Sequence, residues 1–174
     1  TVVTDGETGE PIYFPKSSIK RDDLTVIKAS CCLPAVCKPI VIDGKDCFDG
    51  GISDPIPFQK AFDMGCDKVI VVISKPVDFR KSPQKHMPII KAALKKYPKV
   101  FDRLAVRHEV YNRQLEEAIK LQEQGKVIIL APHDCYGVNT LTREPAALEK
   151  LYEEGRRCAD EHLSEIKAPG EKTA

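Results

Sequence analysis

The chain has 174 residues, with 27 Lys and Arg against 26 Asp and Glu, and a formal net charge of +1. Hydrophobic residues make up 42% and charged residues 30%, which is typical of a folded globular chain and excludes a disordered one. The apolar run Val69 to Ile73 is far shorter than the roughly 20 residues of a membrane-spanning helix. The near-neutral charge argues against a general nucleic-acid binder. We therefore expect neither a spanning helix nor nucleic acid as a partner.

Cysteine and histidine usage points to a reducing compartment and to no metal. Seven cysteines are an odd number, and no Cys-x-x-Cys pair is present. The first residues, Thr1 to Asp5, lack the charged, apolar and small-residue regions of a signal peptide. The four histidines lie far apart without the spacing of metal ligands. We predict a cytoplasmic protein with neither a metal nor a cofactor.

In chain order, the first half predicts two hairpins around a short helix. A turn-rich stretch separates two short strand patterns, and Asp43-Gly44 is the favoured two-residue turn of a second hairpin. Asp22 or Asp23 can cap the helix between them, which must end before Pro34. The predicted elements are strands at Thr1–Val3 and Ile12–Phe14, a helix over 24–31, and strands over 38–42 and 45–48.

The rest of the chain alternates strand and helix patterns. The two β-branched runs are apolar on both faces, so they predict interior strands of a mostly parallel sheet covered by helices on both sides. The predicted elements are a helix that Asp54 can cap, opening with Pro55 or Pro57 and closing at Gly65, a strand over 69–73, helices within 88–125 broken once at Pro98, a strand over 126–131, and a helix starting near Thr142. Seven residues of that last helix are expected to face inward: Leu148, Leu151, Tyr152, Cys158, Ala159, Leu163 and Ile166. We predict one α/β domain over 1–167 and a polar tail over 168–174.

The tripeptide Asp49-Gly50-Gly51 is the most informative candidate for chemistry. A carboxylate at the end of a strand, followed by two glycines, has no bulky neighbour to block a reacting group. The bare tripeptide is nevertheless a plain turn in most proteins, because Asp and Gly dominate turns for backbone reasons.

The context of this tripeptide resembles the C-terminal half of the patatin-like phospholipase family. That pattern has a helix ending in Ala-Ser with a following Pro, then a hairpin, Asp-Gly-Gly, a Pro-containing segment, and Gly-x-Asp before an apolar strand. The matching residues are Ala29-Ser30 with Pro34, Asp49-Gly50-Gly51, Pro55 and Pro57, and Gly65-Cys66-Asp67. The resemblance implies a three-layer α/β/α fold and a serine hydrolase acting on lipid esters. It also implies that Asp49 is the aspartate of a Ser-Asp dyad, supported by Gly50 and Gly51.

The family's Gly-x-Ser-x-Gly elbow and its glycine-rich oxyanion loop are both missing from these residues. Ser53 is followed by Asp54-Pro55 and cannot form such an elbow. Ser30 and Cys31 are candidate nucleophiles by residue type alone, without a base at an activating spacing. We therefore interpret the chain as a fragment of a lipid acyl hydrolase, inactive alone, and we expect a fragment with an uncovered strand edge to self-associate.

A second hypothesis is a non-catalytic interaction or membrane-surface module. From Arg80 to Arg107 the chain has nine basic residues and one acid, Asp102. Such a segment can approach anionic lipid headgroups peripherally, although a solvated helical face is the commoner use of such charges. No phosphate-binding glycine motif favours a nucleotide-binding domain.

Histidines and cysteines elsewhere are given structural interpretations. His108 lies on an apolar stripe and is expected to be packed and hydrogen-bonded. His133-Asp134-Cys135 follows a predicted strand and is expected to be a loop. The cysteines near the proposed site are expected to be small buried hydrophobes; they are Cys31, Cys32, Cys37, Cys47 and Cys66.

Overall fold

The structure is a computed structural model that describes residues 1–139 and 142–167. These residues form two compact units, each made from two stretches of chain. The first unit contains Thr1–Pro57 and Lys81–Arg113, and the second contains Phe58–Arg80 and the chain from Gln114 onward. The predicted polar tail over 168–174 lies outside the described residues.

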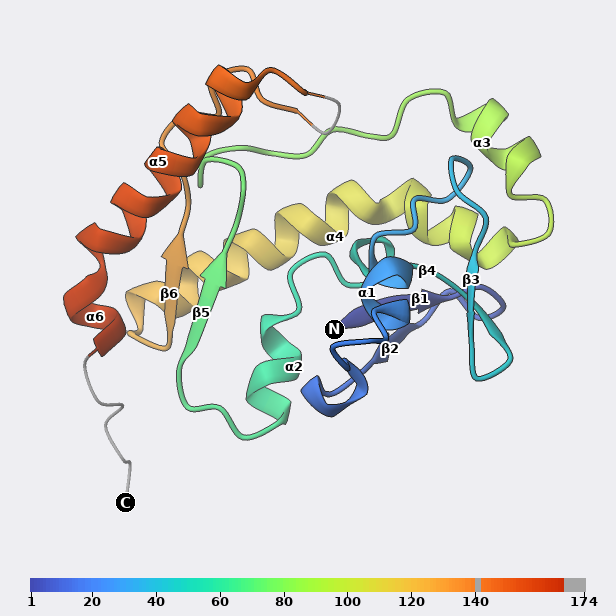
Figure 1. Cartoon of the computed structure of the whole chain (residues 1–174), viewed down its shortest axis with the longest axis horizontal. Helices are drawn as coiled ribbons and strands as arrows, with labels where there is room; N and C mark the ends of the chain where they lie inside the picture. Colours follow the sequence, from blue (N-terminus) through green and yellow to red (C-terminus); the bar gives the residue numbers. More distant parts are fainter. Residues whose placement is uncertain (140–141, 168–174) are drawn as a thin grey trace. The chain divides into compact units, whose positions relative to one another are not determined.

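The first unit is built on a four-stranded antiparallel sheet with strand order β2-β1-β4-β3 (Figure 1). Asp43 and Gly44 both have positive φ values, 49° and 78°, which is the geometry that an Asp-Gly turn supplies to a tight hairpin. Both predicted hairpins are therefore confirmed. The strands are β1 (Val2–Asp5), β2 (Pro11–Tyr13), β3 (Ile40–Ile42) and β4 (Lys45–Asp49), with the helix α1 (Thr25–Ser30) and a short 3-10 helix at Lys16–Ser18.

Two helices close the core of the first unit. The predicted break at Pro98 separates α3 (Met87–Ala93) from α4 (Pro98–Glu123), because proline removes a backbone donor and is tolerated only at the start of a helix. Phe48 of β4 makes an edge-to-face contact with Tyr97, with 4.9 Å between the ring centroids. The buried residues around it are Cys32, Ile52, Leu94, Val100 and Leu104. The core of the first unit thus packs around Phe48, next to the end of β4.

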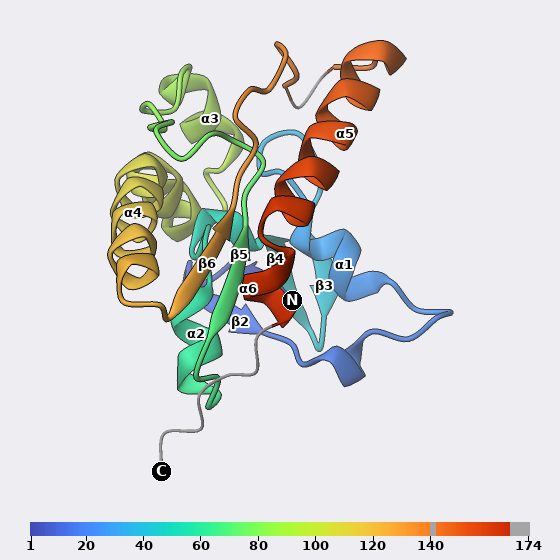
Figure 2. The same ribbon diagram turned by 90° about the vertical axis from the view of Figure 1, so that its left-hand side faces the viewer.

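The second unit contains a parallel pair of strands, β5 (Val69–Val72) and β6 (Val127–Leu130), in register from Val69 opposite Val127 to Val72 opposite Leu130. Figure 2 shows these two strands side by side. The helices of this unit are α2 (Phe58–Asp63), the last part of α4, α5 (Pro145–Glu161) and α6 (Leu163–Lys167). The chain mixes helices and strands as predicted, but the mostly parallel central sheet is wrong, because the larger sheet is antiparallel and only two strands are parallel.

Apolar side chains remain uncovered on the second unit. Ile70 and Val72 of β5 are 44% and 74% exposed, so the prediction of an interior strand for this run is wrong within these 174 residues. The last helix begins at Pro145 rather than near Thr142, and it ends at Glu161 before the separate α6. Of the residues expected to face inward, Cys158 is buried, and Leu151, Ala159 and Ile166 are half-buried. Tyr152 is 59% exposed, and Leu148 and Leu163 are exposed as well, so the prediction is wrong for these three.

The exposed strand β5 is a surface through which two copies of the chain could associate. Parallel strands are normally covered on both faces, and an open edge with apolar side chains is a template for pairing with another strand. Within the described residues β5 pairs with β6 alone. The self-association expected from the sequence stays a prediction, and β5 is the surface to which it applies. Among the described residues, no helix is both long enough and apolar enough to span a membrane.

Candidate functional site

Asp49 is the last residue of β4 and begins the 3-10 helix η2 (Gly50–Ile52). Its backbone N–H donates to the Cys32 carbonyl at 2.9 Å, and its carboxylate Oδ1 accepts the Gly51 N–H at 2.7 Å. The side chain is half-buried, and its second oxygen, Oδ2, has no hydrogen-bond partner among the described residues. The turn therefore holds one carboxylate oxygen and leaves the other without a hydrogen-bond partner among the described residues.

Glycine is needed at the two positions of the motif, Gly50 and Gly51, for different structural reasons. A Cβ on Gly50 would lie 2.2 Å from the carbonyl oxygen of Val2, so the backbone of β1 occupies the space that any other side chain would need. A Cβ on Gly51 would lie 3.1 Å from Arg107 Nη2 and 3.1 Å from Asp49 Oδ1. Gly50 thus permits the approach of two strands, and Gly51 permits the approach of a guanidinium.

Arg107 joins the helix α4 to this turn. Its Nε donates to the Gly51 carbonyl at 2.6 Å. Arg107 Nη2 and Asp49 Oδ1 each lie 3.1 Å from the position that a Cβ would take on Gly51. The two atoms are therefore at most twice that distance apart. A fixed positive charge therefore stands near the carboxylate. Sequence reasoning missed this residue, since 56 positions separate Arg107 from Gly51.

The other predicted candidates near Asp49 have structural roles. Ser53 Oγ shares a hydrogen bond with Thr4 Oγ1 at 2.8 Å, and Thr4 Oγ1 donates to the Asp49 carbonyl at 2.7 Å. Ser53 therefore fastens the turn to β1. Ser30 ends α1, and Cys31 is exposed just after it. Neither Ser30 nor Cys31 hydrogen-bonds the Asp49 carboxylate within the part of the chain that the structure describes.

The cysteines differ in whether their side chains are buried or lie at the surface. All seven are free thiols, and only Cys32, Cys47 and Cys158 are buried. Burial raises the pKa of Cys32, and the nearby Cys37 and Asp49 raise it further, so this thiol is protonated and unreactive beside the turn. The prediction of buried hydrophobes holds for Cys32 and Cys47. It is wrong for three residues that lie at the surface, namely Cys31, Cys37 and Cys66.

His108 differs from its expected description in one respect. Its side chain is packed and mostly buried, and Nε2 lies 3.8 Å from Glu109 Oε1. Its Nδ1 is buried and has no hydrogen-bond partner within the described residues. The prediction of a packed histidine is confirmed, whereas the prediction of a hydrogen-bonded one is wrong for Nδ1.

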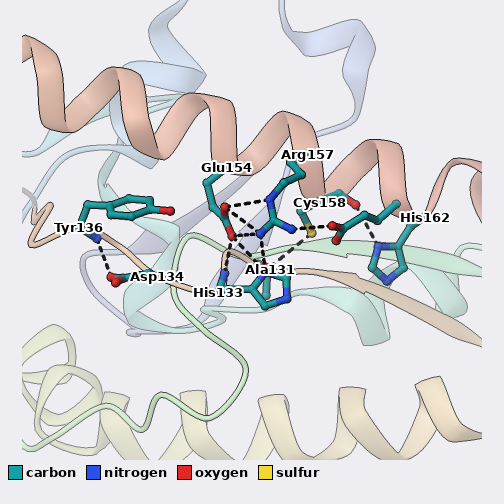
Figure 3. A network of polar contacts seen from close by, with 9 residues as sticks. Ala131, His133, Asp134, Tyr136, Glu154, Arg157, Cys158 and His162 are labelled. Atoms are coloured by element: carbon teal, nitrogen blue, oxygen red, sulfur yellow. Dashed lines mark hydrogen bonds and ion pairs between the residues drawn. The ribbon is translucent and has the colours of Figure 1, made fainter.

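The second unit contains a network around a buried carboxylate, Glu154 of α5. Figure 3 shows Glu154 and Arg157 pointing from α5 toward His133, in the loop after β6. Arg157 Nη2 donates to both Glu154 oxygens, at 2.8 and 2.9 Å. The backbone N–H of His133 donates to Glu154 Oε1 at 2.9 Å, and His133 Nδ1 lies 3.0 Å from the same oxygen. The segment at His133 is a loop, as predicted, and Glu154 fastens it to α5.

The charge state of this network follows from its contacts. Hydrogen bonds from Arg157, and then from the backbone and ring of His133, lower the pKa of Glu154 from 4.5 to about 2 despite the opposing effect of burial. Glu154 is therefore ionised at neutral pH. The network borders an open groove of about 750 Å³ lined by Tyr136, Ala146, Glu149, Lys150, Glu153, Glu154 and Arg157. Sequence reasoning missed Glu154 because Glu153 and Glu154 are adjacent on a charged helix, and only burial distinguishes them.

The Glu154 network predicts a loss of stability in acid. Because the pKa of Glu154 is depressed in the folded chain, its contribution is present above pH 4.5 and is lost as the pH falls toward 2. Glu154→Gln should lower the Tm at pH 7 and flatten the dependence of Tm on pH between these values. Circular dichroism melts across that range measure both effects. The matched control is Glu153→Gln, at an exposed neighbour, which should keep the wild-type pH profile; equal profiles for the two variants would contradict the assignment.

Comparison with known proteins shows similarity to a family model and to a curated protein. Residues 97–168, less than half of the chain, match a family model described as a domain of unknown function, DUF6363. The chain is 29% identical over 162 residues to the uncharacterized protein YjjU of Escherichia coli (strain K12). That match covers 90% of this chain and 44% of YjjU. The chain thus spans less than half the length of this relative.

These similarities correct the family suggested by the sequence. The matching family model is not a patatin-like domain, and the matched relative has no assigned activity. The resemblance to patatin-like phospholipases, which depended on short motifs in the first half of the chain, is therefore wrong as a family assignment. The positions of Asp49, Gly50 and Gly51 in the structure do not depend on it.

Proposed function

We propose that this chain supplies Asp49 as the proton-accepting carboxylate of a carboxylic ester hydrolase whose nucleophile lies outside these residues. The observation that carries the proposal is the geometry of Asp49: one carboxylate oxygen is held by the Gly51 N–H, and the other has no partner among the described residues. The short turn holds the carboxylate, and Arg107 holds the Gly51 carbonyl of that turn. A preoriented carboxylate with one open oxygen is what a base needs in order to accept a proton.

The proposed step is proton-balanced. As a serine Oγ from another segment attacks the carbonyl carbon of an ester, its proton moves to Asp49 Oδ2. The proton then passes to the departing alkoxide, which leaves as the alcohol, and water later hydrolyses the acyl-enzyme. None of the serines that sequence reasoning singled out contacts this oxygen within the described residues. More than half of YjjU lies outside the match, so proteins of that kind have chain length enough for a nucleophile.

The test uses the protein encoded by the full reading frame that contains these residues. We expect it to hydrolyse p-nitrophenyl butyrate, and Asp49→Asn to lower kcat/KM by at least about 100-fold, the lower range for a lost general base. The control is Asp43→Asn, in an exposed hairpin turn whose positive φ asparagine tolerates. The 174-residue chain alone should show no turnover. Ester hydrolysis that is unchanged by Asp49→Asn, or absent from the full-length protein, would overturn the proposal.

A further inference from the structure

The basic residues from Lys85 to Arg107, all in the first unit, fall into two groups. Some are used internally: Arg103 pairs with Glu10, Lys96 Nζ lies 3.3 Å from Asp46 Oδ2, and Arg107 binds the Gly51 carbonyl. These contacts hold the unit together and remove those charges from a common basic surface.

Four lysines around α3 form the second group. They are exposed and have no acidic partner among the described residues. Lys85 precedes α3, Lys91 lies on α3, Lys95 lies in the connection to α4, and Lys99 lies in the first turn of α4. The helix α3 lies at the periphery of the first unit (Figure 1). We call them the free lysines, because none pairs with an acid among the described residues: Lys85, Lys91, Lys95 and Lys99. Lys91 Nζ also lies 5.7 Å from the centre of the Phe101 ring. Asp102 is the single acid between Arg80 and Arg107.

An apolar side chain stands among these lysines. Ile90 of α3 and Leu94 just after it pack into the core of the unit, so α3 is anchored from one side. The neighbouring Ile89 is 70% exposed. A large exposed apolar side chain in a segment that also carries exposed lysines combines the two properties that hold a short segment at a lipid interface, namely an apolar anchor and cations for anionic headgroups.

We propose that α3 and the free lysines bind the surface of a membrane that contains anionic lipid. An exposed isoleucine favours lipid over nucleic acid, because nucleic-acid binding uses aromatic or hydrogen-bonding groups at the bases. The surface lies at one side of the unit and does not involve Asp49, so lipid binding stands whether or not Asp49 takes part in hydrolysis. Each free lysine near such a surface contributes about fivefold to binding at low salt, and salt screens the contribution.

Vesicle co-sedimentation of the 174-residue chain tests this proposal. We expect binding to vesicles of phosphatidylcholine mixed with phosphatidylglycerol, little binding to phosphatidylcholine alone, and loss of binding at high salt. Lys91→Glu/Lys95→Glu should weaken binding by about 25-fold or more. The control is Lys68→Glu/Lys126→Glu, which makes the same charge change at two exposed lysines of the second unit. Ile89→Ser should weaken binding severalfold without changing net charge.

Three results would overturn the proposal. The first is binding that ignores lipid charge, and the second is an equal loss of binding in both double variants, since that would reflect net charge rather than this surface. The third is binding to duplex DNA that competes with the vesicles and is unaffected by Ile89→Ser, which would identify a nucleic-acid surface. Circular dichroism of each variant establishes that it is folded before binding is compared.

Discussion

Gly50→Ala should destabilise the first unit by about 3 kcal/mol or more, because the new Cβ would lie 2.2 Å from the Val2 carbonyl oxygen and 2.5 Å from its carbon. These are backbone atoms, so no side-chain rotation relieves the clash. β1 would have to move away from β4, next to the pairing of Val3 with Asp49. Urea denaturation followed by circular dichroism measures the loss.

The matched control for this substitution is Gly155→Ala. Gly155 lies inside α5, and a Cβ there meets no atom within 4 Å. Alanine is the better helix former, so this variant should gain about 0.5–1 kcal/mol. If Gly50→Ala were as stable as the wild type, the close approach of β1 to the motif would be disproved. Gly50→Ala in the full-length protein should also lose the ester hydrolysis proposed for Asp49.

Phe48→Ala should cost about 3–5 kcal/mol, the usual range for removing a buried aromatic side chain. Phe48 is 1% exposed, packs in the main cluster of the first unit, and contacts the Tyr97 ring edge-to-face. Truncation leaves a cavity directly before Asp49 and removes the contact that positions the start of α4. The same urea denaturation measures this effect.

Tyr152→Ala is the aromatic control for Phe48→Ala. Tyr152 is exposed on α5, so its removal should change stability by less than about 0.5 kcal/mol. A cost for Tyr152→Ala as large as that for Phe48→Ala would show that α5 is buried in solution, for example by association of the chain with itself. A small cost for Phe48→Ala would mean that the cluster beneath β4 is not the core.

The local elements were predictable because their causes are local. The Asp43-Gly44 turn, the break at Pro98 and the end of α2 before Gly65 each follow from the backbone preferences of one or two residues. Sheet order was not predictable, because strand pairing joins distant segments: β1 lies between β2 and β4. The apolar runs at β5 and β6 correctly indicated two strands. They did not indicate how much of each strand's apolar surface other parts of the chain cover.

The candidate site also has a part that the sequence predicted and a part that it did not. Asp49 was singled out from the sequence because a carboxylate before two glycines stands in a recognisable succession of neighbouring motifs, and its role as a base stays a proposal. The contacts that explain it were not visible, since Val2, Thr4 and Arg107 come from other parts of the chain. Glu154 was missed because a single buried glutamate among exposed ones has no distinguishing pattern.

The sequence by itself determined a mixed helix and strand chain, its hairpin turns, its helix boundaries near proline and glycine, and the location of its most suggestive carboxylate. These features depend on dihedral preferences and on the periodicity of apolar residues, which act over a few positions. Only the tertiary structure decided that the chain forms two units, that β5 remains exposed, and that Arg107 stands beside Asp49. Those outcomes depend on which distant surfaces meet, and a local pattern contains no information on that.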